Sequence, residues 1–282
     1  MRLASTSVAN SAARQLGSAC LTTNAAREPA LRNVAAPSFI TRWAVTPSDV
    51  ASAQRLRFKV FAGEMGARLP GLSSISPDRD ADEFDIICRH LIVESNTDAG
   101  DREVVATCRV LLPDGARHVG RLYSDAEFDL SPVCDLLSGA AEMGRVCVAP
   151  AWRNGLLILA LWRELGQLMS REGLDILIGC TSVGLADGGA YAAHLWNDLQ
   201  PTYLVEPAYR VRPWRPLPLR PAGESLSVPV SMPALIKGYL RCGGRLLGPP
   251  ALDAAFNTAD FPMMLRLGDL PPRYRKRLLD CI

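Results

Sequence analysis

An apolar strand, an amphipathic helix and a second apolar strand follow one another directly in this chain. Residues Ala140 to Val148 have the pattern of the first strand, Asn154 to Arg171 of the helix, and Asp175 to Thr181 of the second strand. A strand, a helix and a strand at this spacing form a right-handed βαβ unit. The chain is therefore predicted to be an α/β protein in which these two strands share one sheet.

The residues before this unit predict three more strands, one helix and one long loop. Arg42 to Thr46 is expected to be a short strand, and Pro47-Ser48-Asp49 is a helix-start signal. Two further strands are expected at His90 to Glu94 and Glu103 to Leu112. The polar loop from Gly66 to Asp85 is unusually long for a compact domain, and such loops are more often functional than decorative.

The two ends of the chain differ in character. The first residues contain no acid before Glu28 and few large apolar side chains, so we expect a disordered tail over 1–41, with a transit peptide as the alternative. Residues after 201 carry more strand patterns and a helix at Pro233 to Arg241. We expect them to continue the same domain, which then spans 42–282.

Composition excludes several classes of protein. A net charge of +2 is too small for a general nucleic-acid binder. The eight cysteines form no CxxC pair, which indicates reduced thiols and no metal site. The longest apolar run, 155–162, is too short to span a bilayer. We therefore expect a cytoplasmic protein whose membrane contact, if any, is peripheral at the inner face.

The junction between the first strand and the helix is the first candidate site. Glu142 lies in the apolar strand, Arg145 follows three residues later, and Arg153-Asn154-Gly155 opens the helix. A helix N-terminus presents free N–H groups and partial positive charge to a phosphate, and a glycine allows close approach. The pattern fits a pantetheine phosphate, and it equally fits an ordinary strand–turn–helix joint.

Charged residues outside this junction form a second candidate set. Arg57 and Arg109 lie inside apolar patterns, and a buried arginine needs an anionic partner. Asp80 and Asp85 of the long loop are candidates for that partner, as are Glu142 and a substrate carboxylate. The loop acids are alternatively a site for a cationic substrate, or simply a solvated loop.

Nine segments follow one another in order along residues 42–280. They are RFKVFAGEMG (57–66), EFD (83–85), CRHLIV (88–93), CRVL (108–111), YSDAEFDL (123–130), EMGRVCVAPAWRNG (142–155), GCTSVG (179–184), MPALIKGYLRCGGRL (232–246) and FNTADF (256–261). The motifs of other enzymes are missing: the sequence has no GxxxxGK[ST], HExxH, GxSxG or His-x4-Asp. Together the nine segments resemble those of the bacterial L-ornithine Nα-acyltransferases, which make lyso-ornithine lipid.

The resemblance implies a fold and a reaction. The implied fold is the GNAT α/β sandwich, a mixed β-sheet between helices with a C-terminal extension of the same domain, shared with acyl-homoserine-lactone autoinducer synthases. The implied reaction transfers a (3-hydroxy)acyl chain from acyl carrier protein to the α-amine of L-ornithine. The partner protein carries the 4'-phosphopantetheine, so no bound cofactor is expected. Only Arg153, Asn154 and Gly155 remain of the usual phosphate loop, which favours a carrier-protein donor over coenzyme A.

The resemblance also implies roles for individual residues. Glu142 is the expected general base, acting through a water, and burial would have to raise its pKa. Backbone N–H groups near Val146 to Val148 would stabilise the oxyanion. No covalent intermediate is needed, so Cys147 and Cys180 are expected to be packing residues. The residues expected at the acceptor amino acid are Arg109 or Arg145 for its carboxylate, Asp80 or Asp85 for its side-chain ammonium, and Arg57 beside them.

Partners and rival functions follow from the same comparison. The basic cluster Arg273, Arg275, Lys276 and Arg277 is a candidate docking surface for acidic acyl carrier protein or an anionic membrane, or else a solvated helix end. Without His-x4-Asp, the second acylation requires a separate O-acyltransferase. The alternatives are an N-acyl amino acid synthase with another acceptor, an autoinducer synthase, and a non-enzymatic acyl-carrier-binding module.

Overall fold

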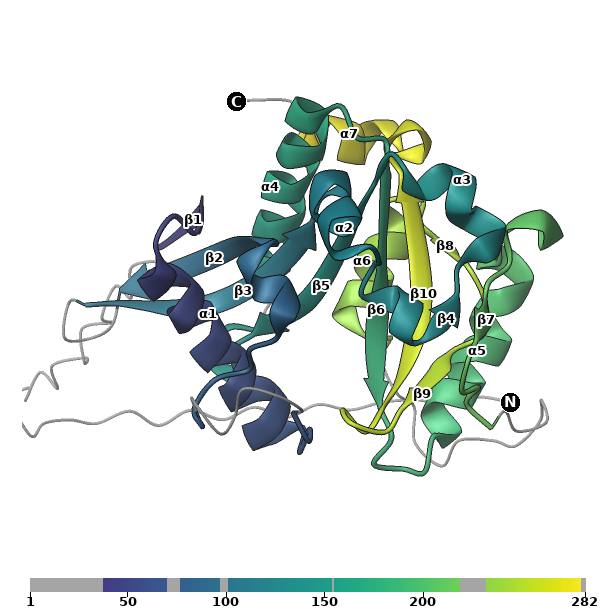
Figure 1. Ribbon diagram of the computed structural model, residues 1–282, viewed down its shortest axis with the longest axis horizontal. Helices are drawn as coiled ribbons and strands as arrows, with labels where there is room; N and C mark the ends of the chain where they lie inside the picture. The colour runs from purple at the N-terminus through teal and green to yellow at the C-terminus, as the bar shows by residue number, and fades with distance from the viewer. Residues whose placement is uncertain (1–37, 70–76, 97–100, 154, 219–231, 280–282) are drawn as a thin grey trace, which may run out of the picture. The chain divides into compact units, whose positions relative to one another are not determined.

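One mixed sheet of eight strands organises the described part of the chain (Figure 1). The computed structural model describes residues 38–69, 77–96, 101–153, 155–218 and 232–279. The strand order is β1-β2-β3-β5-β6-β10-β8, with β9 paired to β10, and β5–β6 is the parallel pair. The strands of this sheet are β1 (Phe39–Trp43), β2 (Arg89–Asn96), β3 (Arg102–Leu111), β5 (Ala140–Val148), β6 (Ile176–Gly184), β8 (Arg245–Leu246), β9 (Ala251–Asp253) and β10 (Thr258–Arg266).

The predicted βαβ unit is confirmed. Strand β5 has the expected bounds, and α4 (Leu156–Glu172) connects it to β6. Helix α4 begins at Leu156 rather than at the expected Asn154, because Gly155 has a φ of 85° and belongs to the turn before the helix. Asn154 itself lies outside the described residues.

Strands β5 and β6 are paired at one end only. Their register covers Ala140–Glu142 against Ile176–Ile178, whereas β6 pairs with β10 along its whole length. At Gly179 a Cβ atom would lie 2.3 Å from the carbonyl oxygen of Met143, so only glycine permits this approach of the two strands. Beyond Met143, the edge of β5 has no pairing with β6. The backbone of β5 is thus available to a ligand on the side that faces away from β3.

Helices cover both faces of β2, β3 and β5 because the strand side chains alternate. Ile92 packs with Leu56 of α1 (Pro47–Phe58) on one face, and Leu91 packs with Leu161 of α4 on the other. Figure 1 shows α1 and α4 on opposite sides of these strands. The prediction of a mixed sheet between helices is therefore confirmed.

Most of the strands that follow residue 201 complete the same large sheet. Strands β8, β9 and β10 all follow residue 201, and β10 lies beside β6. None of the described helices is both long and apolar enough to cross a bilayer. The remaining elements are α2 (Pro113–Val119), α3 (Cys134–Leu137), α5 (Ala190–Tyr203), α6 (Ala234–Arg241), α7 (Pro272–Leu278), a π-helical turn Lys59–Glu64 and the two-stranded sheet of β4 (Phe128–Asp129) and β7 (Arg212–Pro213).

The first strand lies earlier than the sequence indicated. Strand β1 begins at Phe39 and ends at Trp43, ahead of the expected Arg42 to Thr46. Thr46 instead caps α1, since its side chain accepts a hydrogen bond from the Asp49 backbone N–H at 3.2 Å. The predicted tail lies almost wholly outside the described residues, so its disorder stays a prediction.

Candidate active site

A cavity of about 450 Å³ opens where β5 and β6 part. A second cavity of about 260 Å³ lies beside it, and the walls of the two share Tyr123, Arg145, Asp253 and Phe256. The larger cavity is mostly apolar, which suits a pantetheine arm or an acyl chain. Its walls include Val60, Phe61 and Met65 from the π-helical turn after α1 and the residue that follows it, Glu142 to Val148 of β5, and Cys180 to Ser182 of β6.

Glu142 lies in the wall of the larger cavity and is only 3% exposed. Its carboxylate accepts hydrogen bonds from the backbone N–H groups of Tyr123 at 2.6 Å and Ser124 at 2.8 Å, and from the Ser124 hydroxyl. Burial raises the pKa of Glu142, and these hydrogen bonds partly oppose that rise. The structure thus gives this carboxylate the raised pKa that the role of general base requires.

Arg145 occupies a bulge in β5. Thr107 pairs with Cys147 and Arg109 pairs with Gly144, so Arg145 and Val146 both face Cys108. The φ of Arg145 is 51°, a rare value for a residue with a side chain. Strained backbone of this kind often marks a functional residue, and here it belongs to a side chain that lines both cavities.

The guanidinium of Arg145 is held from two sides. It donates to Oδ2 of Asp80 at 3.0 Å and to the hydroxyl of Tyr123 at 2.8 Å. It also lies over the rings of Tyr123 and Phe256, with centroid distances of 4.8 and 4.6 Å. The head group is therefore fixed at the wall between the two cavities.

The acids of the predicted loop pair with arginines inside the protein. Arg57 is 1% exposed and donates to Asp80 and to Asp85, both at 2.8 Å. Arg109 donates to Asp85 at 2.9 Å and to Asp82 at 2.7 Å. The sequence placed Arg57, Arg109, Asp80 and Asp85 together, and the structure brings them into one network, to which Asp82 is an addition.

The members of this network differ in their access to the cavities. Arg57, Asp85 and Arg109 line neither cavity, whereas Asp80 lines the smaller one. Asp80 is only 2% exposed, and its Oδ2 atom already accepts from two arginines. Direct contact of these residues with a substrate stays a prediction, and their geometry fits the positioning of Arg145.

The residues predicted to meet the acyl donor surround the larger cavity. Val146, Val148, Arg153 and Gly155 all line it. Arg153 donates through Nε to the carbonyl oxygen of Val148 at 3.0 Å and forms an ion pair with Glu64. Glu64 therefore competes with any phosphate for Arg153, a partner that the sequence did not suggest.

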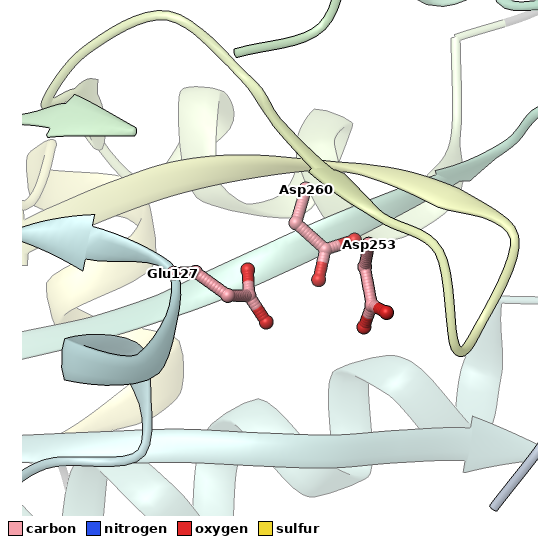
Figure 2. Close-up of side chains that lie close together, drawn as sticks. All are labelled: Glu127, Asp253 and Asp260. Carbon is pink, nitrogen blue, oxygen red and sulfur yellow. The ribbon is translucent and has the colours of Figure 1, made fainter. Parts of the chain in front are cut away.

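One group of acids within the described ranges has the spacing of a cation site: Glu127, Asp253 and Asp260 (Figure 2). Burial, with help from the two aspartates, raises the pKa of Glu127 to about 9. Sequence reasoning missed all three residues. Glu127 and Asp260 lie inside the segments YSDAEFDL and FNTADF, which were noticed only for their resemblance to the lipid enzymes.

We predict that Asp85→Asn lowers the free energy of unfolding by about 3–5 kcal/mol, because it leaves the three arginines of the network, Arg57, Arg109 and Arg145, with only two carboxylates, those of Asp80 and Asp82. The pairing holds the pKa of Asp85 well below its usual range, so its stabilisation is present above pH 4 and is lost as the pH falls. The variant should consequently lose less stability on acidification than the wild type does. Urea unfolding at several pH values measures both effects.

The control for Asp85→Asn is Glu83→Gln in the same turn. The Glu83 side chain is 62% exposed, and among the described residues its ion-pair partner is the exposed Arg121. Its replacement should change the free energy of unfolding by less than about 1 kcal/mol. Equal stabilities of the two variants would contradict a structural role for the buried network.

Comparison with known proteins agrees with this geometry. Residues 56–163 match the family model of the acetyltransferase (GNAT) domain. The chain is 33% identical over 249 residues to the L-ornithine Nα-acyltransferase of Rhodobacter capsulatus, across 86% of this chain and 95% of that protein. It is 31% identical over 249 residues to the Agrobacterium fabrum protein of the same name, across 83% of each.

Among solved structures, the AHL synthase LasI covers 88% of this chain and 99% of its own, with a TM-score of 0.49 and 12% identity. The sequence relatives and the domain match carry the assignment: this chain is an acyltransferase of the GNAT fold and belongs to the family of L-ornithine Nα-acyltransferases.

Proposed function

We propose that this chain transfers a (3-hydroxy)acyl group from acyl carrier protein to the α-amine of L-ornithine, forming lyso-ornithine lipid. The observation that carries the proposal is a buried glutamate, Glu142, in the wall of an apolar cavity at the parting of two strands. The relatives named for ornithine acylation supply the acceptor. Acyl carrier protein is inferred as the donor because only Arg153, Asn154 and Gly155 of the usual phosphate-loop motif are present.

The first chemical task is to deprotonate the amine. An α-ammonium has no lone pair, so a base must take one proton before attack. Glu142 has the raised pKa that this transfer needs, and it reaches the amine through a water. Ser124 and Tyr123 hold its carboxylate in place during the transfer.

The second task is to stabilise the tetrahedral intermediate. The amine nitrogen bonds to the thioester carbon, and the carbonyl oxygen becomes an oxyanion. N–H groups of β5 between Val146 and Val148 lie along the cavity and are the proposed donors to it. The C–S bond then breaks, and the thiolate takes the second amine proton. Burial raises the pKa of the Cys147 thiol to about 12, which fits direct transfer without a cysteine nucleophile.

The third task is to hold the two substrates. Arg145 is the proposed partner of the acceptor carboxylate, because it lines both cavities and the network of Arg57, Asp80 and Asp85 orients it. Gly155 and the N-terminus of α4 are the proposed site of the pantetheine phosphate.

The exposed basic residues of α7 are proposed to dock the acidic carrier protein. Arg273, Lys276 and Arg277 project from α7 with exposed side chains. Electrostatic docking weakens as salt screens the charges. The Michaelis constant for carrier protein should therefore rise with ionic strength, and a salt-insensitive value would remove this role.

The direct test is an assay of the purified protein with 3-hydroxyacyl carrier protein and ornithine. Free thiol and N-acyl-ornithine should appear together. Glycine, glutamine and lysine as acceptors separate this activity from other N-acyl amino acid synthases, and S-adenosylmethionine separates it from autoinducer synthases. Tight carrier-protein binding without transfer would favour a binding module.

We predict that Glu142→Gln lowers kcat by about 10²- to 10⁴-fold, because the amide keeps the shape of the side chain but cannot accept the proton. Glu103→Gln, at a side chain that is 57% exposed on β3, is the matched control and should keep full activity. Thiol release under saturating substrates measures both rates. A Glu142→Gln enzyme with near wild-type kcat would rule out this residue as the base.

We predict that Ser124→Ala moves the acidic limb of the kcat/KM profile to higher pH. The lost hydroxyl donor had stabilised the charged form of Glu142, so its removal raises the pKa of this carboxyl further. The base then needs a higher pH to lose its proton, while the plateau above the limb persists. An unshifted limb would mean that another group controls the profile.

A further inference from the structure

We propose that Glu127, Asp253 and Asp260 form the subsite for the side-chain ammonium of the acceptor, an inference that rests on the proposed function. The three acids come from separate segments: the turn before β4, the strand β9 and the strand β10. One carboxylate oxygen from each lies within 4.8 Å of the others. Figure 2 shows the carboxyl groups of Glu127 and Asp260 facing each other, with Asp253 beside them.

These acids lack the counter-charge that the acids of the long loop have. Asp80, Asp82 and Asp85 each form an ion pair with an arginine. In the described parts of the chain, no lysine or arginine comes within 4.0 Å of a carboxylate oxygen of Glu127, Asp253 or Asp260. Three carboxyl groups so close together repel one another, and they require either protons or a bound cation.

A buried acceptor atom without a donor gives independent support. Oε2 of Glu127 has almost no accessible surface, and no N–H or hydroxyl group within the described structure donates to it; the carboxyl group of Asp260 can only share a proton with Glu127. Asp253 and Asp260 are partly satisfied, since Asp253 accepts from the backbone N–H of Ala255 at 2.8 Å and Asp260 from the Thr258 hydroxyl at 2.9 Å. A primary ammonium has three N–H donors on one centre and would complete this set.

The group lies where an amino acid would place its second amine. Asp253 lines both cavities, Glu127 lines the smaller one and Asp260 the larger one. Arg145 and Asp253 both lie in the wall that the two cavities share. An amino acid whose carboxylate binds Arg145 and whose side-chain ammonium binds the three acids would therefore span this wall. The α-amine then lies between these two anchors, in the cavity that contains Glu142.

The chemistry favours an organic ammonium over a metal ion. Calcium takes six to eight oxygen ligands, and magnesium demands near-octahedral geometry. The three acids offer six carboxylate oxygens, and two of these already accept hydrogen bonds from the protein, which leaves four for a metal ion. Burial and the neighbouring acids raise the pKa of both Glu127 and Asp260, so the empty group holds protons that an ammonium would replace.

The experiment compares two acceptors that differ by a single amine. L-Norvaline has the carbon skeleton of L-ornithine without the δ-amine. The wild-type protein should favour ornithine in kcat/KM by at least about 30-fold, and Glu127→Gln and Asp260→Asn should each remove most of that preference. Their kcat/KM for norvaline should stay near the wild-type value. The control Asp135→Asn, at an exposed acid of α3, should leave both values unchanged.

A binding measurement checks the subsite without acyl transfer. Ornithine should raise the melting temperature of the wild-type protein more than norvaline does, and Glu127→Gln should abolish the difference. The melting temperature of ligand-free Glu127→Gln should not fall below that of the wild type, because the amide, like the protonated carboxyl group that it replaces, carries no charge beside the neighbouring acids. A fall, with equal losses for both acceptors, would assign the acids a structural role and overturn the inference.

Three further experimental outcomes would overturn the ammonium subsite. A wild-type protein that acylates ornithine and norvaline equally well would overturn the subsite and leave the proposed function intact. Absence of acyl transfer to any amino acid would overturn both. Stoichiometric binding of Mn²⁺ in a calorimetric titration, lost in Glu127→Gln and accompanied by loss of activity in EDTA, would replace the ammonium subsite with a metal site.

Discussion

One carboxylate oxygen connects the parts from which the candidate site is built. Oδ2 of Asp80 accepts from Nε of Arg57 at 2.8 Å and from Nε of Arg145 at 3.0 Å. Arg57 belongs to α1, Asp80 to the long loop and Arg145 to the bulge of β5. Removal of this acid would leave Arg57 with Asp85 as its anionic partner and would leave one positive charge of the network uncompensated in the interior. The helix, the loop and the bulge therefore depend on the same contact.

The bulge at Arg145 and the parting of β5 from β6 together make room for a ligand. Gly179 lets the two strands meet closely near Met143, and their pairing ends there. The bulge then turns Arg145 toward Asp80 and Tyr123. An ordinary sheet would fill this space with a continuous ladder of hydrogen bonds. Here the ladder stops, and a cavity takes its place.

The sequence predicted the elements of this arrangement better than their contacts. The bounds of β5 and the βαβ unit followed from apolar periodicity, which depends only on neighbours in the chain. Arg57, Asp80 and Arg109 were recognised as charged residues in need of partners. Which of them would pair depended on the folded loop, and no local pattern shows that Asp80 joins two arginines.

The carboxylate of Glu142 illustrates the same limit. Its two backbone donors come from Tyr123 and Ser124. Nearly every residue type has a backbone N–H group, so the sequence does not show which residues donate to Glu142. The role of Ser124 becomes visible only when a separate connection folds against β5. Similarly, Glu127 and Asp260 lie on distant segments that meet in space, so neither has a recognisable spacing in the chain.

The buried acids fall into two sets with different physical states. Asp82 and Asp85 lie among arginines, which keep their pKa values low and their charges permanent. Burial and the neighbouring acids raise the pKa values of Glu127 and Asp260, so these acids hold protons while no cation is bound. An acid whose charge is neutralised by an arginine fixes the shape of a site, whereas an acid without such a partner can still select a cationic ligand. Within one fold, the first set is thus suited to hold Arg145 in place, and the second to distinguish an acceptor that carries a second ammonium.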